Sequence, residues 1–315
     1  MGPLVIGHGS ALEYWNAACR RTGDVSALGN AASRRRDTAA ACAALARGEV
    51  PQLRDASLAP AGCSLPLQVT VTEPAARPRG RNLVGHVRVA EVPVGAFVQV
   101  GPDMFASSPE FAFTQMADEL TLVELMALAH ELCGTYARLP EGELLLGCPP
   151  LTSTAKLARF IDSSSGFRGR DNAVRTVEYL FDGAATPQQA QVLMLLCLPY
   201  LLGGFYLPRP KVNERVGMAS WERGQAAFYV CDLYWPEARL EVACGSETDP
   251  VRQAALERTG IRTVRITDEL LRDPAQFKKT ARALARALGK RLRYHDPEFS
   301  QAHDELRREL GLPNA

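Results

Sequence analysis

The spacing of hydrophobic and polar positions changes near residue 107 of this chain. Before that point, the clearest pattern is the strict alternation of Leu67-Gln-Val-Thr-Val-Thr72, which is typical of a β-strand with one buried face. Residues 84–89 and 96–100 are further strand candidates. Short helices are predicted at 10–19, with Ser10 as the N-cap, and at 38–47. The first hundred residues therefore predict a small α/β unit.

From about residue 107 to residue 198, apolar residues recur at helical spacing. Ser108 stands before Pro109, and Thr121 and Thr186 stand before two later apolar runs. A hydroxyl at this position accepts a hydrogen bond from a free N–H group of the first turn, which is why it marks a helix start. Helices are predicted to begin at residue 109 and to cover residues 122–136, 157–161, 173–181 and 188–198.

The last third of the chain mixes the two patterns. Residues 229–235 and 240–245 predict two strands joined by a tight turn, and a helix containing Asp249 and Arg252 follows. Gly260 to Ile266 predict another strand. A basic helix is predicted at 273–292, and a short helix is predicted at 304–310 within a polar tail.

These elements predict an α/β protein with two domains. At 315 residues the chain is long enough for each domain to bury a core of its own. We expect a mixed α/β and helical region over residues 1–185 and an α/β domain with a central mixed sheet over residues 186–293. Residues 294–315 are expected to form a polar C-terminal tail.

Charge is balanced over the whole chain but not along it. The net charge of +1 indicates no general affinity for nucleic acid or membrane. Between residues 251 and 293, however, twelve Lys or Arg residues face only four acids. The simplest interpretation is a solvated helix face, and the alternative is a surface that binds phosphate groups. The candidates for nucleic-acid contacts are Arg252, Arg262, Arg265, Lys278, Lys279 and Arg282.

Several other classes of protein have little support. The chain start lacks the basic and apolar regions of a signal peptide, and the longest apolar run, residues 192–205, is too short to span a bilayer. No Cys-x-x-Cys pair occurs among the eight cysteines, which argues against a structural zinc site. His8 and His130 have no partner at metal-ligand spacing. We therefore expect a cytoplasmic protein with reduced thiols and no membrane association.

Asp232 and Glu241 form the candidate catalytic pair. They lie on the two adjacent strands, where two carboxylates can approach one ion, and hard cations such as Mg²⁺ prefer carboxylate oxygens. A bound Mg²⁺ would activate water and neutralise charge during phosphodiester hydrolysis. The alternative is that both acids are surface charges or a remnant of an ancestral site. For Asp249 and Arg252, an ion pair at a helix start is favoured over a catalytic role.

The same segment resembles a known family. Asp232-Leu-Tyr-Trp-Pro-Glu, Leu240-Glu241, Asp249-Pro-Val-Arg252 and Gly260-Ile-Arg-Thr-Val-Arg265-Ile are similar to the endonuclease domain related to very-short-patch repair enzymes, in the PD-(D/E)xK superfamily. Upstream, Leu67–Thr72, Phe105–Glu110, Leu122–Cys133 and Thr186-Pro187 resemble actinobacterial proteins that carry this domain behind an AbiEi-antitoxin-like region. The resemblance implies a restriction-endonuclease-like fold for residues 186–293, Mg²⁺ as the cofactor and DNA as the partner.

Two positions depart from the pattern that this resemblance implies. The residue two positions after Glu241 is Ala243, where Lys or Asp is expected, and Gln189 replaces a Glu two residues after Pro187. A His expected after the second strand is also missing. Losing such a group commonly costs roughly a hundredfold or more in rate. We therefore predict a DNA-associated protein with a degenerate nuclease site and at most residual hydrolysis; the alternative is an antitoxin-like regulatory or protein-binding module that uses the nuclease fold as a scaffold.

Overall fold

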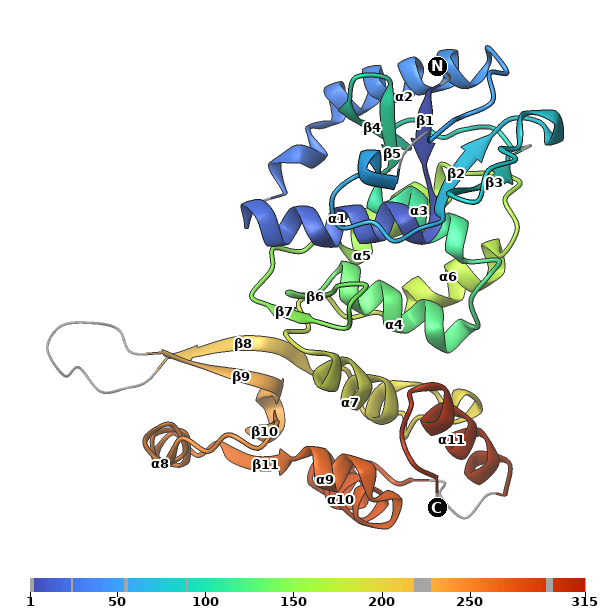
Figure 1. The fold of residues 1–315 in the computed structure, drawn as a ribbon. Coiled ribbons are helices and arrows are strands. Elements are labelled where there is room, and N and C mark those ends of the chain that lie inside the picture. Colours follow the sequence, from blue (N-terminus) through green and yellow to red (C-terminus); the bar gives the residue numbers. More distant parts are fainter. Residues whose placement is uncertain are drawn as a thin grey trace, which may run out of the picture. The chain divides into compact units, whose positions relative to one another are not determined.

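The computed structural model describes residues 3–23, 25–53, 56–88, 90–217, 228–292 and 297–314. The chain forms two compact units, Met1–Leu180 and Phe181–Ala315, so the boundary lies close to the one expected at residue 185. Both units combine helices with a mixed sheet, which confirms the α/β class (Figure 1).

The sheet of unit 1 has the strand order β3-β2-β1-β5-β4. β1 is parallel to β5 and antiparallel to β2, whereas β2 is parallel to β3 and β4 is antiparallel to β5. Its strands are β1 (Leu4–Ile6), β2 (Leu67–Val71), β3 (Leu83–Val87), β4 (Phe97–Gly101) and β5 (Met104–Ser107). The helices of unit 1 are α1 (His8–Thr22), α2 (Ala31–Leu45), α3 (Pro109–Met116), α4 (Leu122–Leu132), α5 (Thr154–Asp162) and α6 (Arg170–Tyr179).

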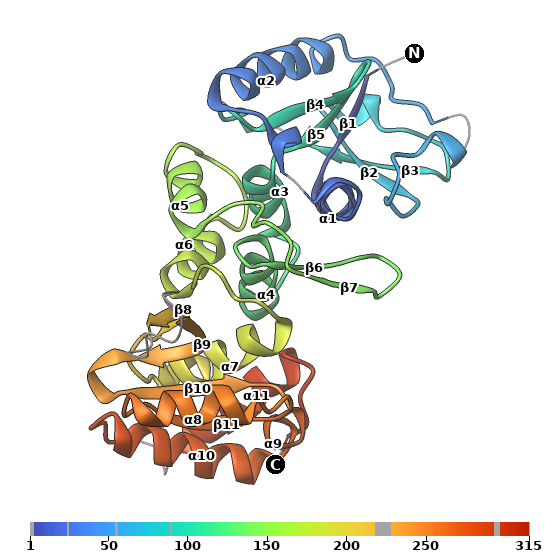
Figure 2. The same ribbon diagram turned by 90° about the vertical axis from the view of Figure 1, so that its left-hand side faces the viewer.

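Each face of this sheet packs against its own core. Because side chains alternate along a strand, Leu4 and Ile6 of β1 lie in one core with Trp15 of α1, and Val5 lies in the other core with Ala41 of α2. Figure 2 shows α1 and α2 on opposite sides of the strands. Unit 1 is therefore a sheet covered on both faces.

The predicted helix starts at Ser108, Thr121 and Thr186 are confirmed. Each hydroxyl accepts a hydrogen bond from a backbone N–H of the first turn, and Thr121 forms a reciprocal capping box with Glu124. Several boundaries were wrong, including the start of α2, which lies at Ala31 instead of residue 38. α1 begins at His8, with Gly7 rather than Ser10 as the N-cap. α4 ends at Leu132, and a short hairpin of β6 (Tyr136–Arg138) and β7 (Leu144–Leu146) follows it.

Unit 2 has a four-stranded mixed sheet in the order β11-β10-β9-β8. β8, β9 and β10 are antiparallel neighbours, and β11 is parallel to β10. Its strands are β8 (Lys211–Gly217), β9 (Phe228–Trp235), β10 (Leu240–Cys244) and β11 (Arg262–Ile266). Its helices are α7 (Pro187–Cys197), α8 (Pro250–Arg258), α9 (Asp268–Arg272), α10 (Pro274–Ala287) and α11 (Pro297–Glu309). α7 packs on β10, and α8 packs on β11.

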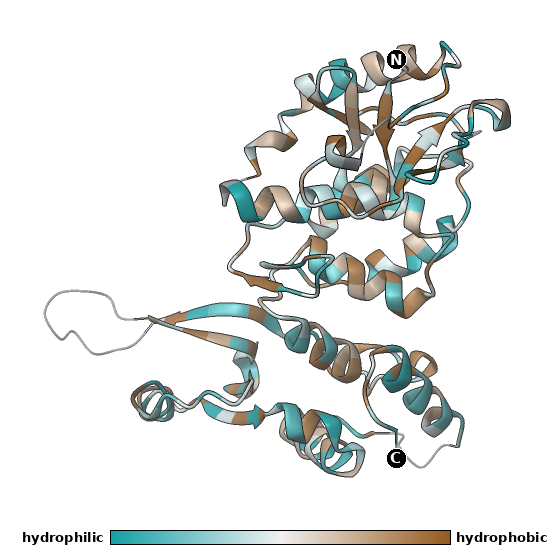
Figure 3. Cartoon of the chain, viewed as in Figure 1, coloured by the Kyte–Doolittle hydropathy of each residue, from teal (hydrophilic) through white to brown (hydrophobic). Residues whose placement is uncertain are grey.

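The second half of α7, residues 192–197, is buried and apolar, and it is mostly brown in Figure 3, whereas the start of the helix carries glutamines and is teal. A helix that is hydrophobic all round belongs in a core, because no side of it is suited to water. Of the glutamines at the start of α7, Gln189 is buried and only 4% exposed. This residue therefore needs hydrogen-bond partners inside the fold.

The expected polar tail over residues 294–315 is wrong for its described part, because α11 is packed into unit 2. Phe299, His303 and Leu306 are buried, and Arg307 is fully buried. The Arg307 guanidinium donates hydrogen bonds to the carbonyl oxygens of Leu271 (3.0 Å) and Pro313 (2.7 Å). Carbonyl oxygens thus satisfy Nε and Nη2 of the buried guanidinium, while Nη1 has no partner among the described residues.

No helix within the described ranges is long and apolar enough to cross a membrane.

Candidate functional site

Asp232 and Glu241 lie on adjacent antiparallel strands, as predicted. β9 and β10 pair Leu233 with Val242 and Tyr234 with Glu241, which places the two acids in neighbouring rows of the sheet. The candidate site of unit 2 is therefore assembled by the sheet itself.

The Glu241 carboxylate is fully buried, and both of its oxygens are already engaged. Oε2 accepts a hydrogen bond from the Thr263 hydroxyl at 2.8 Å, and Thr263 is the register partner of Glu241 on β11. Oε1 forms an ion pair with Nη2 of Arg252, and the same Nη2 also donates to the Val230 carbonyl oxygen at 2.7 Å. Burial lowers the pKa of Arg252, but the hydrogen bond and the charge of Glu241 outweigh burial, so the pKa is raised overall.

Asp232 is held mainly by the backbone. Its Oδ2 accepts a hydrogen bond from the Cys244 N–H at 2.7 Å. Burial raises the pKa of Asp232, and the negative charge of Glu241 raises it further, whereas the Cys244 N–H, the charge of Arg252 and the Gln189 side chain lower it. The carboxylate is therefore partly desolvated, and its hydrogen bonds come from neutral donors.

The Gln189 side chain uses both its carbonyl oxygen and its amide nitrogen in hydrogen bonds. Its Oε1 accepts hydrogen bonds from the Ala185 N–H at 2.8 Å and from Asn213 Nδ2 at 3.1 Å, while Nε2 lies 3.3 Å from Asn213 Oδ1. A glutamate here would have no N–H to donate and would add a third negative charge beside Asp232. The amide is thus matched to its partners, and it joins the start of α7 to β8.

The arrangement does not fit Mg²⁺. Mg²⁺ prefers six oxygen ligands in an octahedron, yet both Glu241 oxygens have partners and Ala243 offers no ligand. The Arg252 guanidinium supplies the positive charge that neutralises Glu241.

The ion pair expected between Asp249 and Arg252 is not the one that forms. Asp249 is the N-cap of α8, and its Oδ1 accepts hydrogen bonds from the backbone N–H groups of Val251 (2.9 Å) and Arg252 (3.0 Å). The Arg252 guanidinium instead reaches Glu241 on β10. A long-range buried partner outcompetes the local one because a buried carboxylate is costly without a charged partner.

The basic residues proposed for nucleic-acid contacts occupy different environments. Arg265 donates to the backbone carbonyl oxygen of Glu247, and Lys278 lies 4.0 Å from Asp304. Arg252 is bound to Glu241, Arg282 is half-buried, and Arg262 and Lys279 are exposed. Only some of these cations therefore face solvent with their charge available to a ligand.

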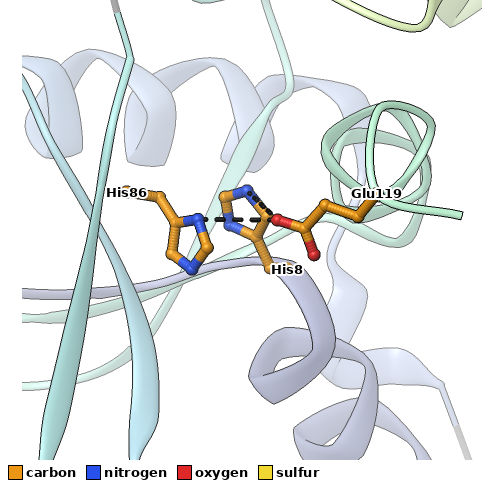
Figure 4. A group of neighbouring side chains, drawn as sticks. All are labelled: His8, His86 and Glu119. Atoms are coloured by element: carbon orange, nitrogen blue, oxygen red, sulfur yellow. Dashed lines mark ion pairs between the residues drawn. The ribbon is translucent and has the colours of Figure 1, made fainter.

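Sequence analysis missed a cluster in unit 1 that consists of His8, His86 and Glu119 (Figure 4). His8 begins α1, His86 lies on β3, and Glu119 follows α3. Glu119 Oε1 lies 3.6 Å from His8 Nε2 and 3.5 Å from His86 Nδ1. His8 was expected to have no metal-ligand partner, because none lies near it in the sequence. Its partners in the structure are distant in the sequence, so no short motif could indicate them.

The two imidazoles of this cluster stack on each other with ring centroids 3.8 Å apart. Burial lowers the pKa of His8 to about 3, and the charges of His86 and Arg88 contribute to the shift. Burial also lowers the pKa of His86, although Glu119 acts in the opposite direction. Both rings are therefore neutral at neutral pH, and a neutral imidazole has a lone pair that can bind a metal ion.

No protein-family model, curated protein or solved structure matches this chain.

Proposed function

We propose that unit 2 binds DNA and does not cleave it. The proposed lack of cleavage rests on one observation. Both carboxylate oxygens of Glu241 already have partners, one in Arg252 and the other in Thr263. The central mixed sheet and its flanking helices support the proposal, since the resemblance to restriction-endonuclease-like domains implies an α/β fold of this class. The resemblance supports a nuclease ancestry, and the hydrogen bonds support loss of the nuclease chemistry.

A metal ion would have to displace Arg252 to reach Glu241. The guanidinium is held at two points, by the carboxylate and by the Val230 carbonyl oxygen, and it is itself mostly buried. Moving it would leave a buried cation without its partner, and breaking a buried pair costs roughly 3–5 kcal/mol. Replacement of Arg252 by Mg²⁺ is therefore unfavourable while the fold is intact.

The DNA-binding half of the proposal is supported by exposed cations outside this cluster. Lys279 and Arg286 are exposed and seven residues apart on α10, so they share one face of the helix. Arg262 is exposed on β11, the strand at one edge of the sheet. Phosphate contacts are electrostatic and tolerate this kind of loose spacing.

We expect no cleavage when the full chain is incubated with plasmid, linear or single-stranded DNA and Mg²⁺ or Mn²⁺. The physical reason is that the residues present leave too few free oxygens for an ion. Product formation is measured on gels against an enzyme-free control. Cleavage by the wild-type chain that disappears in Asp232→Asn would overturn the proposal that the site is inactive.

DNA binding is expected to weaken steeply with salt, and the double variant Lys279→Ala/Arg286→Ala is expected to flatten that dependence. The slope of log K against log salt should fall by about one for each cation that contacts a phosphate. The control is Lys156→Ala/Arg175→Ala, which removes two exposed helical cations from unit 1. Binding is followed by fluorescence anisotropy of a labelled duplex.

Two outcomes of this titration would reject α10 as the DNA-binding surface. One is an equal loss of slope in both double variants, which would indicate a non-specific charge effect. The other is no retention of DNA at low salt, which would favour the alternative of an antitoxin-like, protein-binding module.

A further inference from the structure

Three side chains of types that can ligate a metal ion lie close together in unit 1, far from Asp232 and Glu241 in the sequence. His8, His86 and Glu119 each offer one donor atom, and the three donors lie within 4.8 Å of one another. The two measured nitrogen–oxygen separations are 3.5 and 3.6 Å. Donors that bind a tetrahedral Zn²⁺ at about 2.0–2.2 Å lie about 3.3–3.6 Å apart. The two imidazoles are stacked, so one ring must turn out of the stack before all three donors can reach one ion.

Hydrogen bonding does not explain the cluster. Separations of 3.5 and 3.6 Å are too long for good hydrogen bonds between nitrogen and oxygen. The far nitrogens, His8 Nδ1 and His86 Nε2, are buried and have no hydrogen-bond partner within the described ranges. These unpaired nitrogens are not the two that face Glu119, so they mark the rings as lacking a protein partner among the described residues and leave His8 Nε2 and His86 Nδ1 as the candidate donors.

The surrounding structure holds His8 firmly in place. Its backbone N–H donates to Gln115 Oε1 at 3.0 Å, and Gln115 Nε2 donates to Thr70 Oγ1 at 3.3 Å. Gly7 allows this close approach, because a Cβ at that position would lie 2.9 Å from Thr70 Oγ1. His8 itself has a φ of +51°, a left-handed conformation that non-glycine residues seldom adopt. Such strain is commonly kept where a side chain must point in one direction.

A cavity opens next to the cluster. It has a volume of about 560 Å³, and its lining includes the three cluster residues together with Arg77 and Phe167. Sites that only support a fold use four protein ligands, whereas three ligands beside open space leave a coordination position for water or another molecule. The geometry is therefore that of an open site.

The donor set selects the kind of ion. Imidazole nitrogens suit zinc, cobalt, nickel and copper, whereas Mg²⁺ and Ca²⁺ prefer oxygen ligands. Two of the three donors here are imidazole nitrogens. We propose that His8, His86 and Glu119 form an open site for one divalent first-row transition-metal ion, with Zn²⁺ as the best match.

The test uses the full chain stripped of metal with a chelator and titrated with Zn²⁺ by calorimetry. We expect one site per chain, and we expect His86→Ala and Glu119→Gln each to weaken it by at least about 100-fold. Both residues are partly exposed, so these changes should spare the fold, which circular dichroism verifies. The matched control, Glu141→Gln, alters an exposed acid outside the cluster and should bind like the wild type.

A Co²⁺ titration identifies the ligands independently of affinity. Co²⁺ held by imidazole and carboxylate shows weak visible bands, whereas bonding to cysteine adds an intense sulfur-to-metal charge-transfer band. This distinction matters because all eight cysteines are free thiols. The proposal is overturned by a charge-transfer band at one equivalent, by wild-type affinity in both variants, by absence of Zn²⁺ binding, or by equal affinity for Mg²⁺.

Discussion

Replacing Arg252 with alanine is expected to lower the free energy of unfolding of unit 2 by about 3–5 kcal/mol. Glu241 is fully buried, and the substitution would leave its charge with only neutral side-chain partners, the Thr263 hydroxyl and the Cys231 thiol. The loss is large because the carboxylate can neither reach water nor find another cation. Surface ion pairs, in contrast, contribute at most about 1 kcal/mol.

The measurement is chemical denaturation followed by hydrogen exchange of peptides from unit 2. This readout keeps the unfolding of the two units apart, since a two-unit chain need not unfold in one step. Arg258→Ala is the matched control, because Arg258 is an exposed arginine on the same helix. Adding Glu241→Gln to Arg252→Ala should recover part of the loss by removing the buried charge. Equal effects of Arg252→Ala and Arg258→Ala would contradict the buried-pair interpretation.

The stability of unit 2 is expected to fall by roughly 3 kcal/mol as the pH is lowered from about 6.5 to about 4. His303 is fully buried, and its Nδ1 donates to the Gly203 carbonyl oxygen at 2.7 Å, while Nε2 has no partner within the described ranges. Burial lowers the pKa of His303 to about 4, and the charges of Lys278 and Arg307 contribute, whereas the Gly203 carbonyl and Asp304 oppose the shift.

The direction of this pH effect follows from the protonation of His303 in the folded and unfolded states. In the unfolded chain the imidazole takes up a proton near pH 6.5, whereas in the folded unit it stays neutral down to about pH 4. Over this window the unfolded state binds more protons, so lowering the pH favours unfolding. Above pH 6.5 the contribution of His303 is constant.

The test compares the pH dependence of unfolding in the wild type and in His303→Asn. Asparagine can keep a donor near the Gly203 carbonyl oxygen, but it does not titrate in this range. We expect the variant to lose most of the slope between pH 6.5 and pH 4. An unchanged slope would show that other groups control the acid sensitivity of unit 2.

The local features of the fold could be read from the sequence because neighbouring residues create them. The caps at Ser108, Thr121 and Thr186 depend on a side chain and an N–H group three residues away. The alternation of apolar and polar residues in β2 and the apolar residues of β9 and β10 are likewise short-range patterns. These signals also placed Asp232 and Glu241 on adjacent strands.

Other elements escaped sequence analysis for physical reasons. β8 is an edge strand with mostly polar residues and few buried side chains, so it has no apolar face to reveal it. β1 has three residues and is buried on both faces, which removes the polar half of the alternating pattern. The polar composition around α11 suggested a tail, yet a few buried residues are enough to pack this helix against unit 2.

The sequence by itself determined the α/β class, the helix starts at Ser108, Thr121 and Thr186, and the two acids on paired strands. Only the tertiary structure decided what those acids do, because Arg252 could pair locally with Asp249 and instead neutralises the buried Glu241. It also brought together His8, His86 and Glu119, which no short motif connects. Periodicity and capping act over a few residues, whereas burial and charge pairing select partners across the whole fold.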